Sequence, residues 1–147
     1  MPILNYTTKI TPEKTVMEIQ QILAKAGAKT ISIDYDEIGQ PSAVTFFIQI
    51  LGRWVNYRLP SNFSGVQAAL QDDPGVPRSL KTEMQARRVA WRITKEWVAA
   101  QMAIIEAQQA ELAEVFLPYA VMGSGRTLFQ EFRSGTLLLG KGEQDER

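Results

Sequence analysis

Two periods of apolar residues run along the chain, and each predicts one kind of secondary structure. The first is an alternation of apolar and polar types, rich in β-branched and aromatic side chains, over residues 29–36, 42–51 and 53–59. Short turns at EIGQP and at Gly52 separate these segments. They predict an antiparallel three-stranded meander with one apolar face that needs helices over it. A weaker alternation over residues 3–8 predicts a further strand at the edge.

The second period returns every three to four residues and predicts helices. Over residues 12–26 it is bounded by Thr11, a suitable N-cap, and by Gly27. Short helices are expected in NFSGVQAAL and in LFQEFR. Residues 80–117 continue the helical pattern without glycine or proline. Such a helix would be roughly 57 Å long, more than a globule of this size spans, so it either breaks or projects.

Together these elements predict one α+β domain. A small antiparallel β-meander packs on an N-terminal helix and on a long C-terminal helix. A chain of 147 residues with 45% apolar content is long enough for one substantial core but short for two domains. We expect a β-α-β-β-β-α part over residues 1–71, a linker over 72–79, a helical part over 80–139 and a flexible tail over 140–147.

Composition narrows the possible chemistry. The chain has no histidine and no cysteine, which excludes disulfides, thiolate metal sites, cysteine nucleophiles and serine triads with histidine. A non-enzymatic protein without a cofactor is therefore expected. Sixteen basic residues balance sixteen acidic ones, so the chain lacks the basic excess of a general polyanion binder. No secretory signal and no apolar run of roughly 18 residues is found, so a cytoplasmic protein without a membrane partner is expected.

Two short motifs can still carry chemistry. Asp34 and Asp36 lie on the same side of a predicted strand and can share a hard cation, although such a pair also suits an open face beside a turn. The GSGRT loop has two glycines before a helix start, where backbone N–H groups can bind an anion beside an arginine. The alternative is a connector that ends in an N-cap. This candidate anion site comprises Gly123, Ser124, Gly125, Arg126 and Thr127.

Aromatic and basic residues gather at two places that can bind a nucleotide or a nucleic acid. Trp54, Asn56 and Arg58 share one face of a predicted strand and can stack a base, unless a helix covers them. The first half of the long helix and the turn before it carry a basic row that can contact phosphates. Its members are Arg78, Lys81, Arg87, Arg88, Arg92 and Lys95.

Charge along the long helix opposes the helix dipole, because bases dominate residues 78–95 and only acids follow over residues 96–117. An antiparallel homodimer would place the bases of one copy opposite the acids of the other and bury the surplus apolar surface. Intramolecular packing against residues 12–26 is the alternative. The expected dimer interface comprises Trp97, Val98, Arg87, Arg88, Arg92, Glu106 and Glu111.

The run AWRITKEWVAAQMAIIEAQQAELAEVFLPYA, followed by GSGRTLFQEF, resembles a family of short uncharacterised proteins encoded by bacteriophages and prophages, with a similar W-R-I-x-K-x-W…E-x-F-L-P-Y helix. The IDYDEIGQP segment resembles the same family, so most of the chain is covered. The resemblance implies an accessory role inside the host cell and brings no catalytic residue. The expected function is binding of a host protein or a small anionic ligand, with counter-defence as one such role. The alternatives are a nucleic-acid-binding accessory factor that uses the basic half of the long helix, and a carboxylate-dependent metal enzyme.

Overall fold

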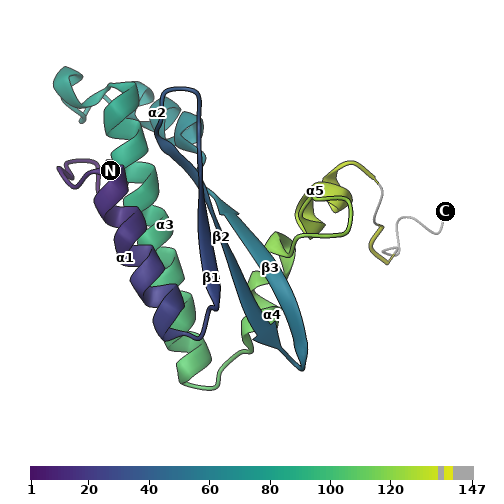
Figure 1. The fold of residues 1–147 in the computed structure, drawn as a ribbon. Coiled ribbons are helices and arrows are strands. Elements are labelled where there is room, and N and C mark those ends of the chain that lie inside the picture. The colour runs from purple at the N-terminus through teal and green to yellow at the C-terminus, as the bar shows by residue number, and fades with distance from the viewer. Residues whose placement is uncertain (136–137, 141–147) are drawn as a thin grey trace.

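The computed structural model of the protein describes residues 1–135 and 138–140 and shows a mixed α+β fold (Figure 1). A three-stranded antiparallel sheet is combined with an N-terminal helix and a long third helix, as the sequence predicts. The expected tail lies outside the described residues from residue 141 onward. The elements are α1 (Pro12–Lys25), β1 (Thr30–Tyr35), β2 (Pro41–Ile50), β3 (Arg53–Pro60), α2 (Phe63–Asp72), α3 (Glu83–Glu106), α4 (Leu112–Phe116) and α5 (Leu128–Arg133), with 3₁₀ turns at Arg78–Leu80 and Leu117–Tyr119.

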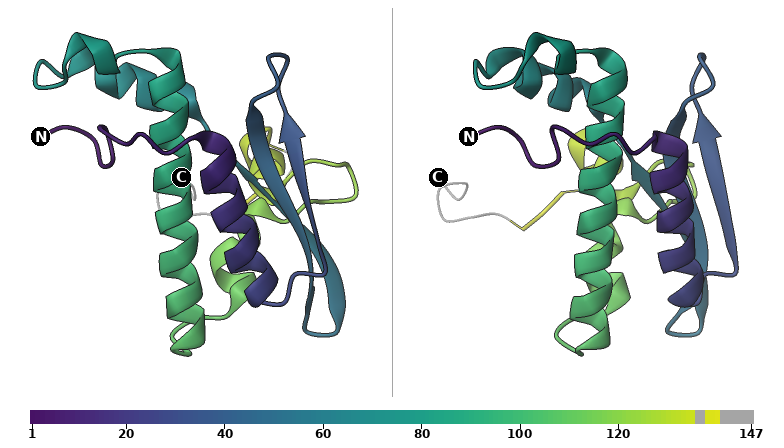
Figure 2. Two further views of the ribbon diagram at one scale, coloured as in Figure 1. Left: turned by 60° about the vertical axis from the view of Figure 1, so that its left-hand side comes forward. Right: turned by 90° about the vertical axis from the view of Figure 1, so that its left-hand side faces the viewer.

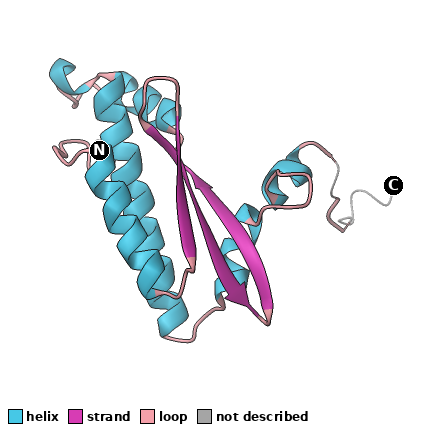
Figure 3. Ribbon diagram, viewed as in Figure 1, coloured by secondary structure: helices cyan, strands magenta, loops and turns pink. Residues whose placement is uncertain are grey.

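The strands pair in the order β1-β2-β3, and Figure 3 shows them as one twisted sheet. The central residue Phe46 pairs with Ile31 on one side and with Tyr57 on the other. The β2–β3 turn consists of Leu51 and Gly52, both with positive φ, at 52° and 79°. Two such residues make the type I′ turn that matches the twist of a hairpin, and a glycine at the second position adopts this backbone without strain.

Helices α1 and α3 lie side by side against one face of the sheet (Figure 2), and the core forms between them. Alternate residues of β2 that face the helices are buried, as the period of two predicts. Rings form the centre of this core: Phe46 stacks on Tyr57 at 5.3 Å and meets the edge of Phe116 at 5.7 Å. The opposite face of the sheet carries the polar positions of each strand.

The long helical pattern is interrupted after Glu106. Ala107 caps α3, Gln108 takes a positive φ of 62°, and α4 begins at Leu112 after a capping box formed by Glu111 with Glu114. The break lets α4 fold back toward the sheet. Apolar residues of the helical pattern on both sides of the break therefore enter the same core. Of the two alternatives that the length of the pattern allows, the broken helix is the one found.

The strand expected over residues 3–8 is wrong. Residues 4–7 form turns, with the amide N–H of Thr8 donating to the carbonyl oxygen of Asn5 at 2.9 Å. The side-chain amide of Gln85 donates to the carbonyl oxygens of Tyr6 and Thr8, both at 2.9 Å. A side chain at the start of α3 thus satisfies carbonyl groups that a neighbouring strand would otherwise bind.

Arg87 joins α3 to the turn between β1 and β2. Its guanidinium pairs with Asp36 at 2.5 Å and lies 4.0 Å from the centre of the Phe63 ring. The other carboxylate oxygen of Asp36 accepts the backbone N–H groups of Ile38 and Gln40, each at 3.0 Å. The N–H of Gln40 and then the Arg87 guanidinium hold the pKa of Asp36 below its usual value, against the opposing effect of burial.

This arrangement predicts how stability depends on pH. Because the pKa of Asp36 is lower in the folded chain than the ordinary 3.8, its contribution is fully present above that value. The contribution is lost as pH falls through the lowered pKa. We therefore expect Asp36→Asn to reduce the pH dependence of the free energy of unfolding on the acid side, as measured by urea unfolding at stepwise lower pH. Glu37→Gln, an exposed change in the same turn, is the control. An acid limb that is identical in the wild type and Asp36→Asn would contradict the prediction.

Candidate functional site

The predicted basic row does not form one exposed strip. Arg92 pairs with Glu18 at 3.0 Å, and Lys95 approaches the same carboxylate at 3.7 Å. Arg87 is buried in its pair with Asp36. Arg88 donates to the side chain of Gln85, Lys81 donates to the carbonyl oxygen of Gln71, and Arg78 is exposed. Because Arg87, Arg92 and Lys95 already pair with acids of the chain, this surface gives weak support to the nucleic-acid alternative.

Most residues of the dimer interface predicted around Trp97 and Val98 make contacts within one copy of the chain. Val98 is fully buried, and the ring of Trp97 meets Phe116 at 5.4 Å and Tyr119 at 5.5 Å. Both side chains belong to the interior of one copy, because α4 folds back over this part of α3. The three arginines of the predicted interface are likewise engaged within the chain. Of the residues expected there, Glu106 and Glu111 are exposed.

The GSGRT loop, where an anion site is predicted, also makes contacts within the chain. The loop is a closed turn in which the N–H of Gly125 donates to the carbonyl oxygen of Met122. Thr127 caps α5 in a reciprocal pair with Gln130. The guanidinium of Arg126 donates to the carbonyl oxygen of Gln130 at 2.8 Å and lies 3.7 Å from the carboxylate of Glu131. Glu131 therefore takes the place beside Arg126 that a bound anion would need.

Asp34 and Asp36 are separated by an irregularity in the pairing of β1 with β2, which falls between Asp34 and Tyr35. The alternation that would put both carboxylates on one side is broken there. Asp36 is also fully engaged with Arg87 and two backbone N–H groups. In residues 1–135 and 138–140, no group of three or more acidic side chains is placed to hold a metal ion. The metal-enzyme alternative thus gains no support from this pair.

The predicted stacking face divides into two environments. Trp54 is 45% exposed, but its ring stacks on Phe47 at 5.0 Å and the ammonium of Lys29 lies 5.2 Å from its centre. One neighbouring ring and a lysine thus cover part of the surface on which a base would stack. Further along β3, the carbonyl oxygen of Asn56 accepts the N–H of Val121 at 2.8 Å. The segment before α5 therefore lies along this edge of the sheet.

Arg58, the third member of that face, lines a cleft instead. Its guanidinium donates to the carbonyl oxygen of Gly125 at 3.0 Å, which places it beside the loop that leads into α5. The cleft has a volume of about 470 Å³ and lies between the end of β3, the start of α2 and α5. Its lining residues are Arg58, Pro60, Ser61, Asn62, Phe63, Tyr119, Thr127, Phe129, Gln130 and Arg133. One residue of the predicted stacking face and one of the predicted anion loop, Thr127, thus meet at a single site.

The cleft is positively charged with aromatic walls. Its lining contains two arginines and no carboxylate, and within the described part of the chain neither Arg58 nor Arg133 has an acidic partner. Phe63, Tyr119 and Phe129 supply ring surfaces, and Phe129 is 48% exposed. The hydroxyl of Ser61 is buried and lacks a hydrogen-bond partner among the described residues. We refer to this site as the cationic cleft.

Most residues of the cationic cleft cannot be recognised in the sequence. Phe129 and Arg133 belong to LFQEFR, whose pattern predicts a short amphipathic helix and nothing about its neighbours. Asn62 and Phe63 stand at the start of α2, more than sixty residues earlier in the chain. Only the long-range contact of the α5 region with β3 brings the two groups together. The signal that the sequence does carry is an aromatic residue close to an arginine, as in LFQEFR.

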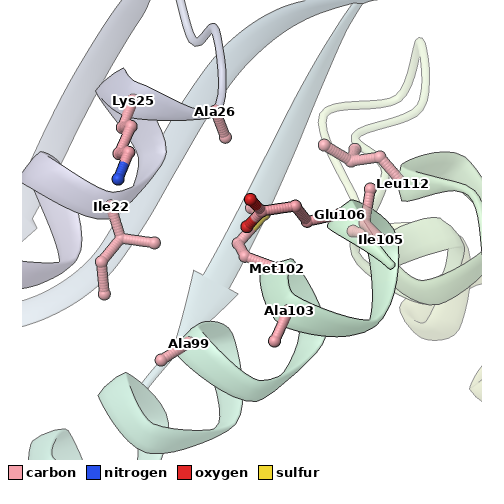
Figure 4. A pocket seen from close by; sticks show the side chains of 9 residues that line it. All are labelled: Ile22, Lys25, Ala26, Ala99, Met102, Ala103, Ile105, Glu106 and Leu112. Carbon is pink, nitrogen blue, oxygen red and sulfur yellow. The ribbon is translucent and has the colours of Figure 1, made fainter. Parts of the chain in front are cut away.

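A second hollow, the apolar groove, lies between the C-terminal ends of α1 and α3 (Figure 4). It also has a volume of about 470 Å³. Its lining is apolar except for Lys25 and Glu106, which stand on opposite walls. The lining residues are Ile22, Lys25, Ala26, Ala99, Met102, Ala103, Ile105, Glu106 and Leu112. Few polar groups converge on its centre, so it offers little to orient a small polar ligand.

Within the part of the chain that the structure describes, no helix combines the length and apolar character needed to cross a membrane. Comparison of the chain with protein-family models, with curated proteins and with solved structures finds no match.

Proposed function

We propose that the protein is a binding protein for a small organic anion, which it holds in the cationic cleft. The observation that carries the proposal is that Arg58 and Arg133 line one hollow whose lining contains no acid. By contrast, the apolar groove carries Glu106, and the hollow beside α4 carries Glu111 and Glu114. Guanidinium groups that line a hollow without an acidic partner favour a ligand of negative charge.

The lining also indicates the shape of the ligand. Guanidinium groups bind a carboxylate or a phosphate through paired hydrogen bonds. The rings of Phe63 and Phe129 offer surface to an apolar or planar body, and Asn62 can hydrogen-bond to its polar substituents. The volume of about 470 Å³ lies within the roughly 300–1,000 Å³ of small-molecule sites. A phosphate or carboxylate attached to a ring therefore fits the chemistry of the cleft.

Binding without catalysis suits these residues. The lining offers no carboxylate, histidine or cysteine to serve as a general base or nucleophile. For a chain that resembles phage-encoded proteins, sequestration of a small host anion, and with it counter-defence, is the biological role that we propose. The nucleic-acid alternative can be separated by a salt series, because contacts with several phosphates make affinity fall steeply with ionic strength.

Calorimetric titration with a nucleoside monophosphate, an aryl carboxylate and inorganic phosphate tests the proposal. We expect at least one ring-bearing anion to bind, and Arg133→Ala to weaken it about tenfold to a hundredfold, the effect of removing a charge-assisted hydrogen bond. Arg133 is exposed at the end of α5, so the melting temperature should stay unchanged. Arg58→Ala should weaken binding similarly.

Arg126→Ala is the matched control. This arginine lies in the adjacent loop, is engaged with Glu131 and does not line the cleft, so its removal should leave the affinity unchanged. Two results would refute the proposal. One is the absence of binding by every ring-bearing anion tested, and the other is equal weakening by Arg126→Ala and Arg133→Ala.

A further inference from the structure

The apolar groove lies away from the cationic cleft. Figure 1 shows α1 and α3 against the sheet and α5 beyond β3, a strand at the edge of the sheet. We propose that the apolar groove is the surface through which two copies of the chain form a homodimer. This inference is independent of the cationic cleft and of the proposed function. It rests on the charges at the rims of the groove and on the small side chains between them.

At the C-terminal end of α3, the negative charge of Glu106 lacks a compensating positive charge among the described residues. The last turn of α3 contains Glu106 and no basic residue, so a negative side chain stands at the negative end of the helix dipole. In the first half of α3, Arg87 pairs with Asp36, and Arg92 and Lys95 share Glu18. Over the described residues Glu106 has no such partner. A cation from outside the chain would stabilise it.

Lys25 lies across the apolar groove from Glu106. This lysine is on the α1 wall, Glu106 is on the α3 wall, and the apolar floor lies between them (Figure 4). A two-fold axis through the middle of the groove exchanges the two walls. It therefore brings Lys25 of each copy over Glu106 of the other, forming two equivalent ion pairs. A partner with a single sign of charge would be repelled by one of the walls.

The floor of the apolar groove includes small side chains. Ala99 and Ala103 lie one turn apart on α3, where small side chains let a second helix approach to about 8 Å between axes. Ile22, Met102 and Leu112 supply the apolar surface that such an approach would bury. The nine residues that line the groove are fewer than the roughly 20–30 residues that each partner contributes to a standard interface, so the surrounding surface must contribute and we expect a dimer of micromolar affinity.

Sedimentation velocity over protein concentrations from about 1 to 200 µM tests the dimer in the range where such an interface should form. We expect Lys25→Glu and Glu106→Lys each to raise the dissociation constant about tenfold, because each change turns two attractive pairs into repulsive ones. The double variant should restore the wild-type value. Lys14→Glu, an exposed lysine in the first turn of α1 and outside the groove, is the matched control and should change little.

A steric variant gives a second, independent measurement. Ala103→Arg places a long side chain in the groove at an exposed position, and we expect it to abolish the dimer while circular dichroism and the melting temperature stay as in the wild type. A wild-type protein that remains monomeric at every concentration overturns the proposal. So does a dimer that is insensitive to the charge reversals and to Ala103→Arg. Because ligand titration reads a different site, either proposal can fail while the other stands.

Discussion

Trp91→Ala is expected to lower the free energy of unfolding by about 3–5 kcal/mol. Trp91 is 1% exposed and belongs to the main core, and its indole N–H donates to the carbonyl oxygen of Pro41 at 3.3 Å. The change removes the packing between α3 and β2 and leaves that carbonyl without its donor. A domain of this kind is stable by only about 5–15 kcal/mol, so a large share of the stability should be lost. Urea unfolding followed by far-ultraviolet circular dichroism measures the loss.

Trp54→Ala provides the comparison on the other face of the sheet. Trp54 is partly exposed and stacks on Phe47, so its removal should cost about 1 kcal/mol or less. Trp91→Phe retains an aromatic ring but loses the donor to Pro41 and should fall between the two. Equal losses for Trp91→Ala and Trp54→Ala would contradict the placement of Trp91 in the core.

Phe116→Ala is expected to cost about 3–5 kcal/mol as well, with its effect concentrated in the C-terminal part of the chain. The ring of Phe116 meets Phe46 at 5.7 Å and Trp97 at 5.4 Å, both edge to face. Helix α4 has only five residues, too few to persist without this anchor. We expect the amides of residues 112–133 to lose hydrogen-exchange protection while those of β2 keep most of theirs.

The segments that form two walls of the cationic cleft come after Phe116 in the sequence. Phe116→Ala should therefore also abolish ligand binding. Phe132→Ala is the control, since Phe132 is exposed on α5 and does not line the cleft. It should change neither exchange nor binding by much. If Phe116→Ala raised exchange evenly across the sheet and the helices, α4 would not be a separately anchored element.

The sequence predicts those parts of the fold that depend on neighbouring residues. Thr11 caps α1 through the N–H of Lys14, as the motif before the helix indicates. The alternation in β2 predicts which side chains are buried, because the period of a strand and the covering of one face decide it together. The segment over residues 3–8 is an exception, because its weak alternation predicts a strand, whereas the chain there forms a turn that Gln85 holds by hydrogen bonds.

Interactions between residues that are far apart in the sequence cannot be predicted from local patterns. The helical pattern over residues 80–117 does not reveal the break after Glu106, because the residues around the break are compatible with a helix. The basic row predicts an exposed surface, but Asp36 pairs with Arg87 and Glu18 pairs with Arg92, from elements more than fifty residues away in the sequence. The cationic cleft likewise depends on residues from both halves of the chain, none of which has a local motif that points to the others.

The contact between Trp97 and Tyr119 makes the fluorescence of Trp97 an intrinsic reporter of the cationic cleft. The two ring centres are 5.5 Å apart, and Tyr119 also lines the cationic cleft. An occupant that moves Tyr119 therefore changes the surroundings of the Trp97 indole, whose emission depends on them. Trp54 and Trp91 do not line the cleft and supply a constant background. Intrinsic fluorescence of the unlabelled protein can thus follow how the cleft fills.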